Sequence, residues 1–250
     1  MRQTLIILAV LIAIANLTSA NPVCTTNTMA YYMATYKDAT TGCMVDDKLF
    51  YNFNYSGTQS PGTGTPGSVL APTSSQVMVT GSLLNPNEPG LVFTAPNGSG
   101  GTLWSVNGTS ILSSPLYIDS NISFTVAVIG GLPNITDAFL DFAGHFAVSG
   151  RGLATIGETV VFDGGTSSIG LGVDSNVGPF SQTVNFTGVS FVRVSKDLLV
   201  TVPRSRSGPQ VGSASITQFT EGFSEGPEPI STVLFGSGLV GIGLLRLRRR

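Results

Sequence analysis

The chain has 250 residues, a length that a single all-β domain can occupy. Only 10% of the residues are charged, against roughly 25% in an ordinary soluble domain. Residues 21–226 contain seven basic and thirteen acidic residues, so this span carries a net charge of −6. An acidic span without clustered Lys and Arg argues against nucleic acid as a partner, because phosphate binding requires such clusters.

The first twenty residues have the pattern of a secretory signal peptide. Arg2 gives a positive start, residues 5–14 are an unbroken apolar run, and Thr18-Ser19-Ala20 supplies the small residues of a cleavage site. The run is too short for a transmembrane helix. We expect the secretion machinery to export the chain and signal peptidase to cut after Ala20. A lipoprotein signal would place a cysteine directly after the cut, so lipid anchoring is disfavoured.

Both cysteines, Cys24 and Cys43, lie in the exported part, where oxidising conditions favour a disulfide. Closing this loop of roughly 20 residues is worth about 3 kcal/mol in the chain-entropy model. A redox or metal-binding pair is the alternative. The absence of CxxC spacing and of a nearby histidine in the sequence favours the structural disulfide.

The segment between the cysteines predicts one short helix. Apolar residues recur there at the i, i+3, i+4 and i+7 spacing of a helix face, at Met29, Tyr32, Met33 and Tyr36. Thr26 or Asn27 could cap this helix. A weaker helix signal covers residues 136–142.

Alternation of apolar and polar residues dominates the remaining sequence and predicts half-buried strands. Long alternating runs lie at 49–56, 122–128, 180–186 and 192–202, and shorter ones at 76–83, 89–95, 145–149, 158–162 and 212–219. Leu49, Tyr51, Phe53 and Tyr55 are expected to share one face of their strand. Lys196 alone interrupts the apolar face of the 192–202 run.

These strands are separated by Gly, Pro, Asn and Asp turns, which indicates an all-β fold class. We expect one antiparallel β-sandwich or jelly-roll-like domain over residues 21–220, with one short N-terminal helix. The signal peptide precedes this domain, and a membrane-sorting segment over residues 221–250 follows it.

The C-terminal segment combines three features in a fixed order. Pro227-Glu228-Pro229 comes first, and an apolar, small-residue run at 230–245 follows, long enough for a short span of about 24 Å. The chain ends in arginines that would stay cytoplasmic and leave the domain outside, namely Arg246, Arg248, Arg249 and Arg250. Together these features resemble the PEP-CTERM sorting signal of exported bacterial proteins.

This resemblance implies recognition of Pro227, Glu228 and Pro229 by an exosortase, a membrane-embedded cysteine transpeptidase. It also implies anchoring in the inner membrane during sorting, and then display at the cell surface or in the extracellular matrix. A plain, uncleaved tail anchor is the alternative. The domain also resembles a pattern of uncharacterised PEP-CTERM proteins, carried by Cys24, Gly42-Cys43, Asp47-Lys48, Phe50, Phe53, Tyr55, Lys196-Asp197 and residues 212–216.

No residues assemble into a catalytic or metal site in the sequence, and no cofactor is expected. His145 is the only histidine and lies in an alternating run without a nucleophile motif, so we interpret it as an ordinary strand residue. Asp137 and Asp141 could share a helix face, but glycoside chemistry also requires a defined separation. Residues 174–178 resemble part of a calcium loop, and turn formation is the favoured interpretation.

The leading functional hypothesis is therefore a non-enzymatic surface or matrix protein with a structural or interaction role. A carbohydrate-binding module for extracellular polysaccharide is the alternative, and a secreted hydrolase comes third. Trp104 with Tyr117 could form a sugar-stacking platform, although ordinary packing is the favoured interpretation of both. The fold cannot decide, because sandwiches host all three functions.

Overall fold

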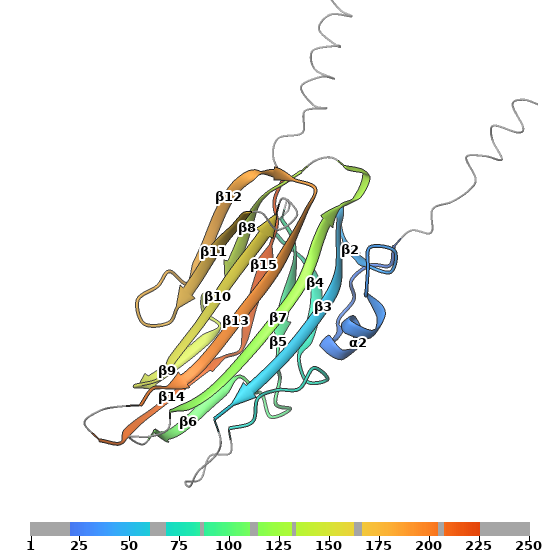
Figure 1. Cartoon of the computed structure of the whole chain (residues 1–250). Coiled ribbons are helices and arrows are strands. Elements are labelled where there is room, and N and C mark those ends of the chain that lie inside the picture. The colour runs from blue at the N-terminus through green and yellow to red at the C-terminus, as the bar shows by residue number, and fades with distance from the viewer. Residues whose placement is uncertain are drawn as a thin grey trace, which may run out of the picture.

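The computed structural model describes residues 21–60, 69–85, 88–110, 115–131, 134–162, 167–204 and 208–225. Two antiparallel six-stranded sheets are stacked face to face in this part of the chain (Figure 1). This confirms the predicted antiparallel β-sandwich. The signal peptide, its cleavage site at Ala20 and residues 226–250 of the expected sorting segment, with Pro227, Glu228 and Pro229, lie outside the described residues. Residues 221–225, expected in that segment, belong to the sandwich instead, since β15 ends at Gly222 and Phe223 is buried in the core.

Sheet I and sheet II each contain six strands in a fixed order. Sheet I runs β11 (Ser167–Asp174), β10 (Leu153–Phe162), β13 (Phe191–Val202), β7 (Leu116–Val128), β3 (Lys48–Gln59) and β2 (Cys43–Val45). Sheet II runs β1 (Asn27–Thr28), β4 (Met78–Asn85), β5 (Glu88–Thr94), β15 (Gln218–Gly222), β8 (Ile135–Asp141) and β12 (Ser181–Val189). A smaller sheet at one end contains β6 (Ser105–Ser110), β14 (Gln210–Ile216) and β9 (Phe146–Gly150), and a short 3-10 turn, η1 (Ile129–Gly131), follows β7.

The predicted N-terminal helix is α2 (Met29–Thr35), and it packs beside β3 and β4 (Figure 1). Its cap is Thr28, whose hydroxyl accepts a hydrogen bond from the Tyr31 amide at 3.2 Å. The expected caps, Thr26 and Asn27, are therefore wrong by one or two residues. The Cys24–Cys43 disulfide is confirmed, with an S–S distance of 2.11 Å, and it ties the chain before the helix to β2.

The weak helix expected at 136–142 is a strand, β8. Its backbone pairs with β12 on one side and β15 on the other, and Ile135, Ala138 and Leu140 are buried. Pairing on both edges and burial in the sandwich outweigh a weak local helix preference. No helix within the described ranges is long and apolar enough to cross a membrane.

Aromatic rings join the two sheets in the core. Phe124 of sheet I stacks on Phe93 of sheet II at 5.9 Å between ring centroids, and Phe93 stacks on Phe219 at 4.8 Å. Phe223, directly after β15, reaches Phe50 of sheet I at 6.1 Å. Such ring pairs add stabilisation beyond the apolar area that they bury.

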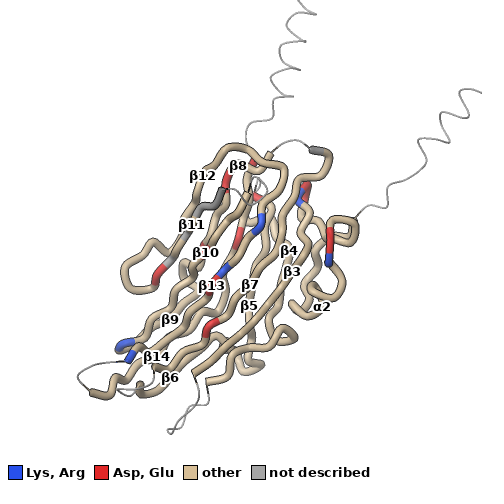
Figure 2. Tube along the Cα trace, in the orientation of Figure 1, with Lys and Arg blue, Asp and Glu red and all other residues tan. Residues whose placement is uncertain are grey.

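Charged residues are few along the strands (Figure 2), yet two buried lysines lie between the sheets. Lys196 of β13 contacts Glu158 of β10 and Glu221 of β15, and Lys48 of β3 contacts Asp47 and Glu225. Both lysines are fully buried. Each one ties sheet I to the β15 segment of sheet II.

A bulge in β3 changes which side chains face outward. The register of β3 against β7 shifts between Tyr51 and Asn54, and Asn52 adopts a left-handed backbone with φ of 58°. Phe50 lies in the core before the bulge and Phe53 after it. The prediction that Leu49, Tyr51, Phe53 and Tyr55 share one face is therefore wrong, because the extra residue inverts the alternation.

Candidate functional site

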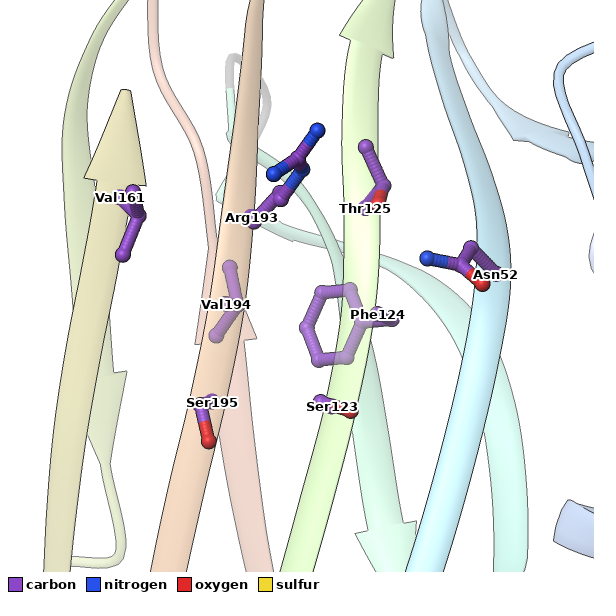
Figure 3. Close-up of a pocket in the computed structure, with 8 residues that line it drawn as sticks. All are labelled: Asn52, Ser123, Phe124, Thr125, Val161, Arg193, Val194 and Ser195. Carbon is purple, nitrogen blue, oxygen red and sulfur yellow. The ribbon is translucent and has the colours of Figure 1, made fainter. Parts of the chain in front are cut away.

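The candidate site is a shallow pocket on the outer surface of sheet I, where β10, β13, β7 and β3 lie side by side (Figure 3). Its volume is about 270 Å³. It is lined by Asn52, Ser123, Phe124, Thr125, Val161, Arg193, Val194 and Ser195.

Strand register places three polar side chains in a row across the pocket. Arg193 of β13 lies directly opposite Thr125 of β7, and Asn52 projects from β3 toward the same strand (Figure 3). Phe124 and Val194 alternate with these residues and are buried in the core, so the sheet itself forms the floor.

Hydroxyl and amide groups extend this polar surface beyond the pocket. Ser195 pairs with Ser123 in the next register position, and the Asn121 amide reaches the Ser195 hydroxyl at 3.5 Å. The outward positions of the neighbouring strands continue the pattern with Asn54, Ser56, Thr155 and Thr159. The part of the outer face of sheet I around the pocket therefore presents mainly small hydroxyl and amide side chains.

The bulge in β3 is what brings Asn52 into the pocket. The backbone N–H of Asn52 donates a hydrogen bond to the Tyr36 carbonyl at the end of α2, at 2.8 Å. Asparagine is one of the few residues that tolerate the left-handed conformation required there. Bulges of this kind commonly re-aim a side chain next to a functional site.

Arg193 is the one charged residue that lines the pocket. Its side chain is exposed, and no carboxylate among the described residues lies within salt-bridge distance of it. Asp197 lies four residues further along β13, which corresponds to roughly 13 Å at the rise of a strand. The guanidinium, with its five N–H donors, can therefore engage an external acceptor.

Two carboxyl groups, Asp119 and Asp197, lie next to each other further along the same face. Burial, together with a hydrogen bond to Asp197 and its charge, raises the pKa of Asp119 to about 6. One of these carboxyls therefore keeps its proton below that pH.

The residues singled out in the sequence occupy other places. His145 lies in the bend just before β9 rather than in a strand as predicted, and its ring nitrogen Nε2 lies 3.4 Å from the side-chain amide nitrogen of Gln218. Trp104 is fully buried and its indole nitrogen donates to the Ser120 hydroxyl at 3.3 Å, so the packing interpretation is confirmed and no platform forms with Tyr117.

The aspartates considered for catalysis are engaged in local structure. Asp137 accepts a hydrogen bond from the Ser224 amide at 3.0 Å, and Asp141 accepts one from the Ala143 amide at 3.1 Å. Asp174 accepts one from the Asn176 amide at 2.7 Å, which confirms the turn. Within the described residues, no group of three or more His, Cys, Asp or Glu side chains could hold a metal ion.

The sequence did not single out Asn52, Thr125 or Arg193. Arg193 and Thr125 are visible as polar positions in alternating runs, but their pairing depends on strand order. The outward direction of Asn52 depends on the bulge, which leaves no clear mark in the sequence.

No family model matches the sequence, and no curated protein is similar to it. Solved structures that align include the enzymatically active domain of bacteriophage CBA120 tailspike protein 4, at 13% identity and a TM-score of 0.28, covering 69% of this chain and 19% of that one. The carbohydrate-binding module TmCBM61, in complex with β-1,4-galactotriose, aligns at 15% identity and a TM-score of 0.27, over 69% of this chain and 88% of that one. The family 32 carbohydrate-binding module of C. perfringens NanJ, in complex with galactose, aligns at 11% identity and a TM-score of 0.21. The alignment covers 68% of this chain and 93% of that one.

The chain thus spans about a fifth of the tailspike domain. At these low sequence identities and TM-scores, the alignments do not indicate a ligand or an activity for this chain. The chemistry of the pocket follows from its own residues.

Substitutions at Asn52 should separate backbone strain from side-chain chemistry. Asn52→Gly removes the carboxamide but suits the left-handed backbone, so unfolding stability should be unchanged or slightly higher. Asn52→Ala should cost about 1 kcal/mol, because an alanine Cβ is strained there. Equilibrium unfolding in urea measures both variants. Equal stability of the two would show that the bulge does not impose this conformation.

The raised pKa of Asp119 predicts a pH dependence. Its folded-state pKa of about 6 lies above the unfolded value, so the folded state holds the proton more tightly. Its contribution to stability is therefore full only below the unfolded pKa of 3.8 and is lost as the pH rises from there through about 6. Asp119→Asn should remove this part of the decline. Urea unfolding of both proteins between pH 4 and 7 measures it, and parallel curves would contradict the assignment.

Proposed function

We propose that this chain is an exported protein whose β-sandwich binds acidic extracellular polysaccharide at the cell surface. The observation that carries the proposal is the row of Arg193, Thr125 and Asn52 across the outer face of sheet I. Arg193 and Asn52 are exposed and offer a cation and a carboxamide, while the buried Thr125 lies between them on the pocket floor.

The chemistry of the row suits an acidic sugar. A guanidinium pairs with a carboxylate through two parallel hydrogen bonds, which gives both affinity and orientation. A carboxamide and a hydroxyl can each donate to and accept from sugar hydroxyls. The volume of about 270 Å³ lies just below the roughly 300–1,000 Å³ of ligand pockets. This suits one sugar unit, with the rest of the polymer lying on the neighbouring hydroxyl and amide side chains.

The sequence alone favoured a purely structural role. The polar row in the pocket supports carbohydrate binding instead. Both hypotheses share the same route of export. The hydrolase hypothesis loses its named aspartates, since Asp137 and Asp141 are engaged in local hydrogen bonds away from the pocket.

Export and sorting form the second part of the proposal. It is supported by the signal-peptide pattern over residues 1–20 and by the order of Pro-Glu-Pro, apolar run and arginines over residues 227–250. In this scheme an exosortase processes the tail at the motif, and the domain reaches the surface or the extracellular matrix.

Removing the pocket arginine should weaken polysaccharide binding. Arg193→Ala should lower affinity about tenfold or more, since a charge-assisted pair is worth about 1.5–3 kcal/mol. Affinity gel electrophoresis with alginate, polygalacturonate and hyaluronan, beside neutral dextran, measures the retardation.

Arg151→Ala is the matched control, because it removes the same charge from an exposed turn outside the pocket. It should leave retardation unchanged. Equal loss in both variants, or no retardation of the wild type by any acidic polymer, would overturn the proposal.

Sorting predicts a defined pair of mature termini. Intact mass of the protein from its native host should show loss of residues 1–20 and a cut near Gly226. Changing Pro227 and Pro229 to Ala should abolish the second cut, because the exosortase would no longer recognise its motif. A chain that keeps Arg250 in both forms would instead be a plain tail-anchored protein.

A further inference from the structure

The buried Lys196 cluster brings an amine and two carboxyl groups into contact inside the core. Glu158 lies directly opposite Lys196 on the neighbouring strand, and its carboxylate accepts a hydrogen bond from the amine. Glu221 comes from the facing sheet, with Oε2 at 2.5 Å from Nζ. The side chains of all three residues have no solvent exposure.

The charges of this cluster balance only if one of its two carboxyl groups is protonated. One lysine faces two carboxyl groups, and Glu158 Oε1 and Glu221 Oε1 are buried without a hydrogen-bond partner among the described residues. Such unpaired buried oxygens are costly and call for an explanation. Burial and the charge of Glu158 raise the pKa of Glu221 well above its ordinary value, which favours the neutral form of Glu221 beside the Lys196–Glu158 pair.

The surroundings exclude water from the three groups. The amine lies 5.8 Å from the centre of the Phe219 ring, and the alternating neighbours on its own strand, Val194 and Leu198, are buried. A neutral carboxylic acid, an amine and a carboxylate that can take up a proton therefore meet in an apolar site. These are the reactants and the acid–base group of an amide condensation.

We propose that Lys196 and Glu221 become joined by an intramolecular amide bond, with Glu158 as the acid–base group. Glu158 takes a proton from the Lys196 ammonium, and the freed amine attacks Cδ of the protonated Glu221 carboxyl. Glu158 returns the proton to the departing hydroxyl, which leaves as water, and then takes the surplus proton from the new amide nitrogen. A C–N bond forms, a C–O bond breaks, and nothing is oxidised or reduced.

The products remove the buried charges of the cluster. A neutral amide and a protonated Glu158 replace three ionisable groups, so no charge is left in the core. The second buried lysine lacks these conditions. Although Lys48 itself is buried, the side chains of Asp47 and Glu225 are 35% and 20% exposed, so water can solvate the charges there.

The bond would join the two sheets at the last strand that the structure describes. Glu221 lies in β15, five residues before Gly226, near which the proposed cut of the sorting segment falls. If the domain is held through that segment, as proposed above, a pull on the chain acts first on β15. A covalent link to β13 would then resist the separation of β15 from the sandwich.

Peptide mass mapping of the full-length folded protein tests the bond. We expect a branched peptide that joins the Lys196 and Glu221 segments, lighter by one water, about 18 Da, than their sum. Trypsin should fail to cut after Lys196. Recovery of separate Lys196 and Glu221 peptides from the folded wild type would overturn the proposal, and so would a linked pair containing Lys48 and Glu225.

Two variants test the roles of the residues. Lys196→Arg keeps the charge but should give only unlinked Glu221 peptides. Glu158→Gln should also stay unlinked, because it lacks the proton acceptor; linkage in this variant would overturn the role of Glu158. Near-ultraviolet circular dichroism shows whether each variant is folded, and the wild-type map decides the bond even if a variant fails to fold. None of these readouts requires polysaccharide or sorting, so failure of the proposed function leaves the test intact.

Discussion

The contact of Lys196 with Glu158 and Glu221 is the constraint on which the rest of the sandwich depends. Through it, β13 contacts the neighbouring strand β10 in its own sheet and β15 in the facing sheet. Because side chains alternate along a strand, holding Lys196 inside turns Arg193 outward. A core contact thus determines which groups the outer face presents, and removing one partner would leave a buried charge uncompensated.

The outer face combines this regular alternation with one irregularity. β13 and β7 present Arg193 and Thr125 by strict pairing, whereas β3 presents Asn52 only because a bulge breaks its alternation. The end of α2 accepts the hydrogen bond of the bulged amide. The N-terminal helix, the disulfide beside it and the pocket are therefore parts of one arrangement, in which rigid strands hold the polar row in place.

The fold class, the helix and the disulfide could be predicted from the sequence, because periodicity and cysteine placement report on local structure and compartment. The pocket could not, since its row depends on which strands are neighbours and on a one-residue shift in β3. The buried cluster left a partial signal: Lys196 lies on an apolar face, and Glu158 and Glu221 alternate with buried neighbours in the same way. That the three side chains contact one another becomes clear only when the two sheets are stacked, because Glu221 comes from sheet II.

The most direct test of this account is the free energy of unfolding of Lys196→Met in urea, compared with the wild type. Methionine fills a similar volume, so packing is largely kept, and the measurement isolates the amine. The account predicts a loss of at least about 3–5 kcal/mol, because the variant loses the buried amine that contacts Glu158 and Glu221 and cannot form the amide bond proposed above. A variant as stable as the wild type would contradict it, and would mean that the aromatic core alone holds the sheets together.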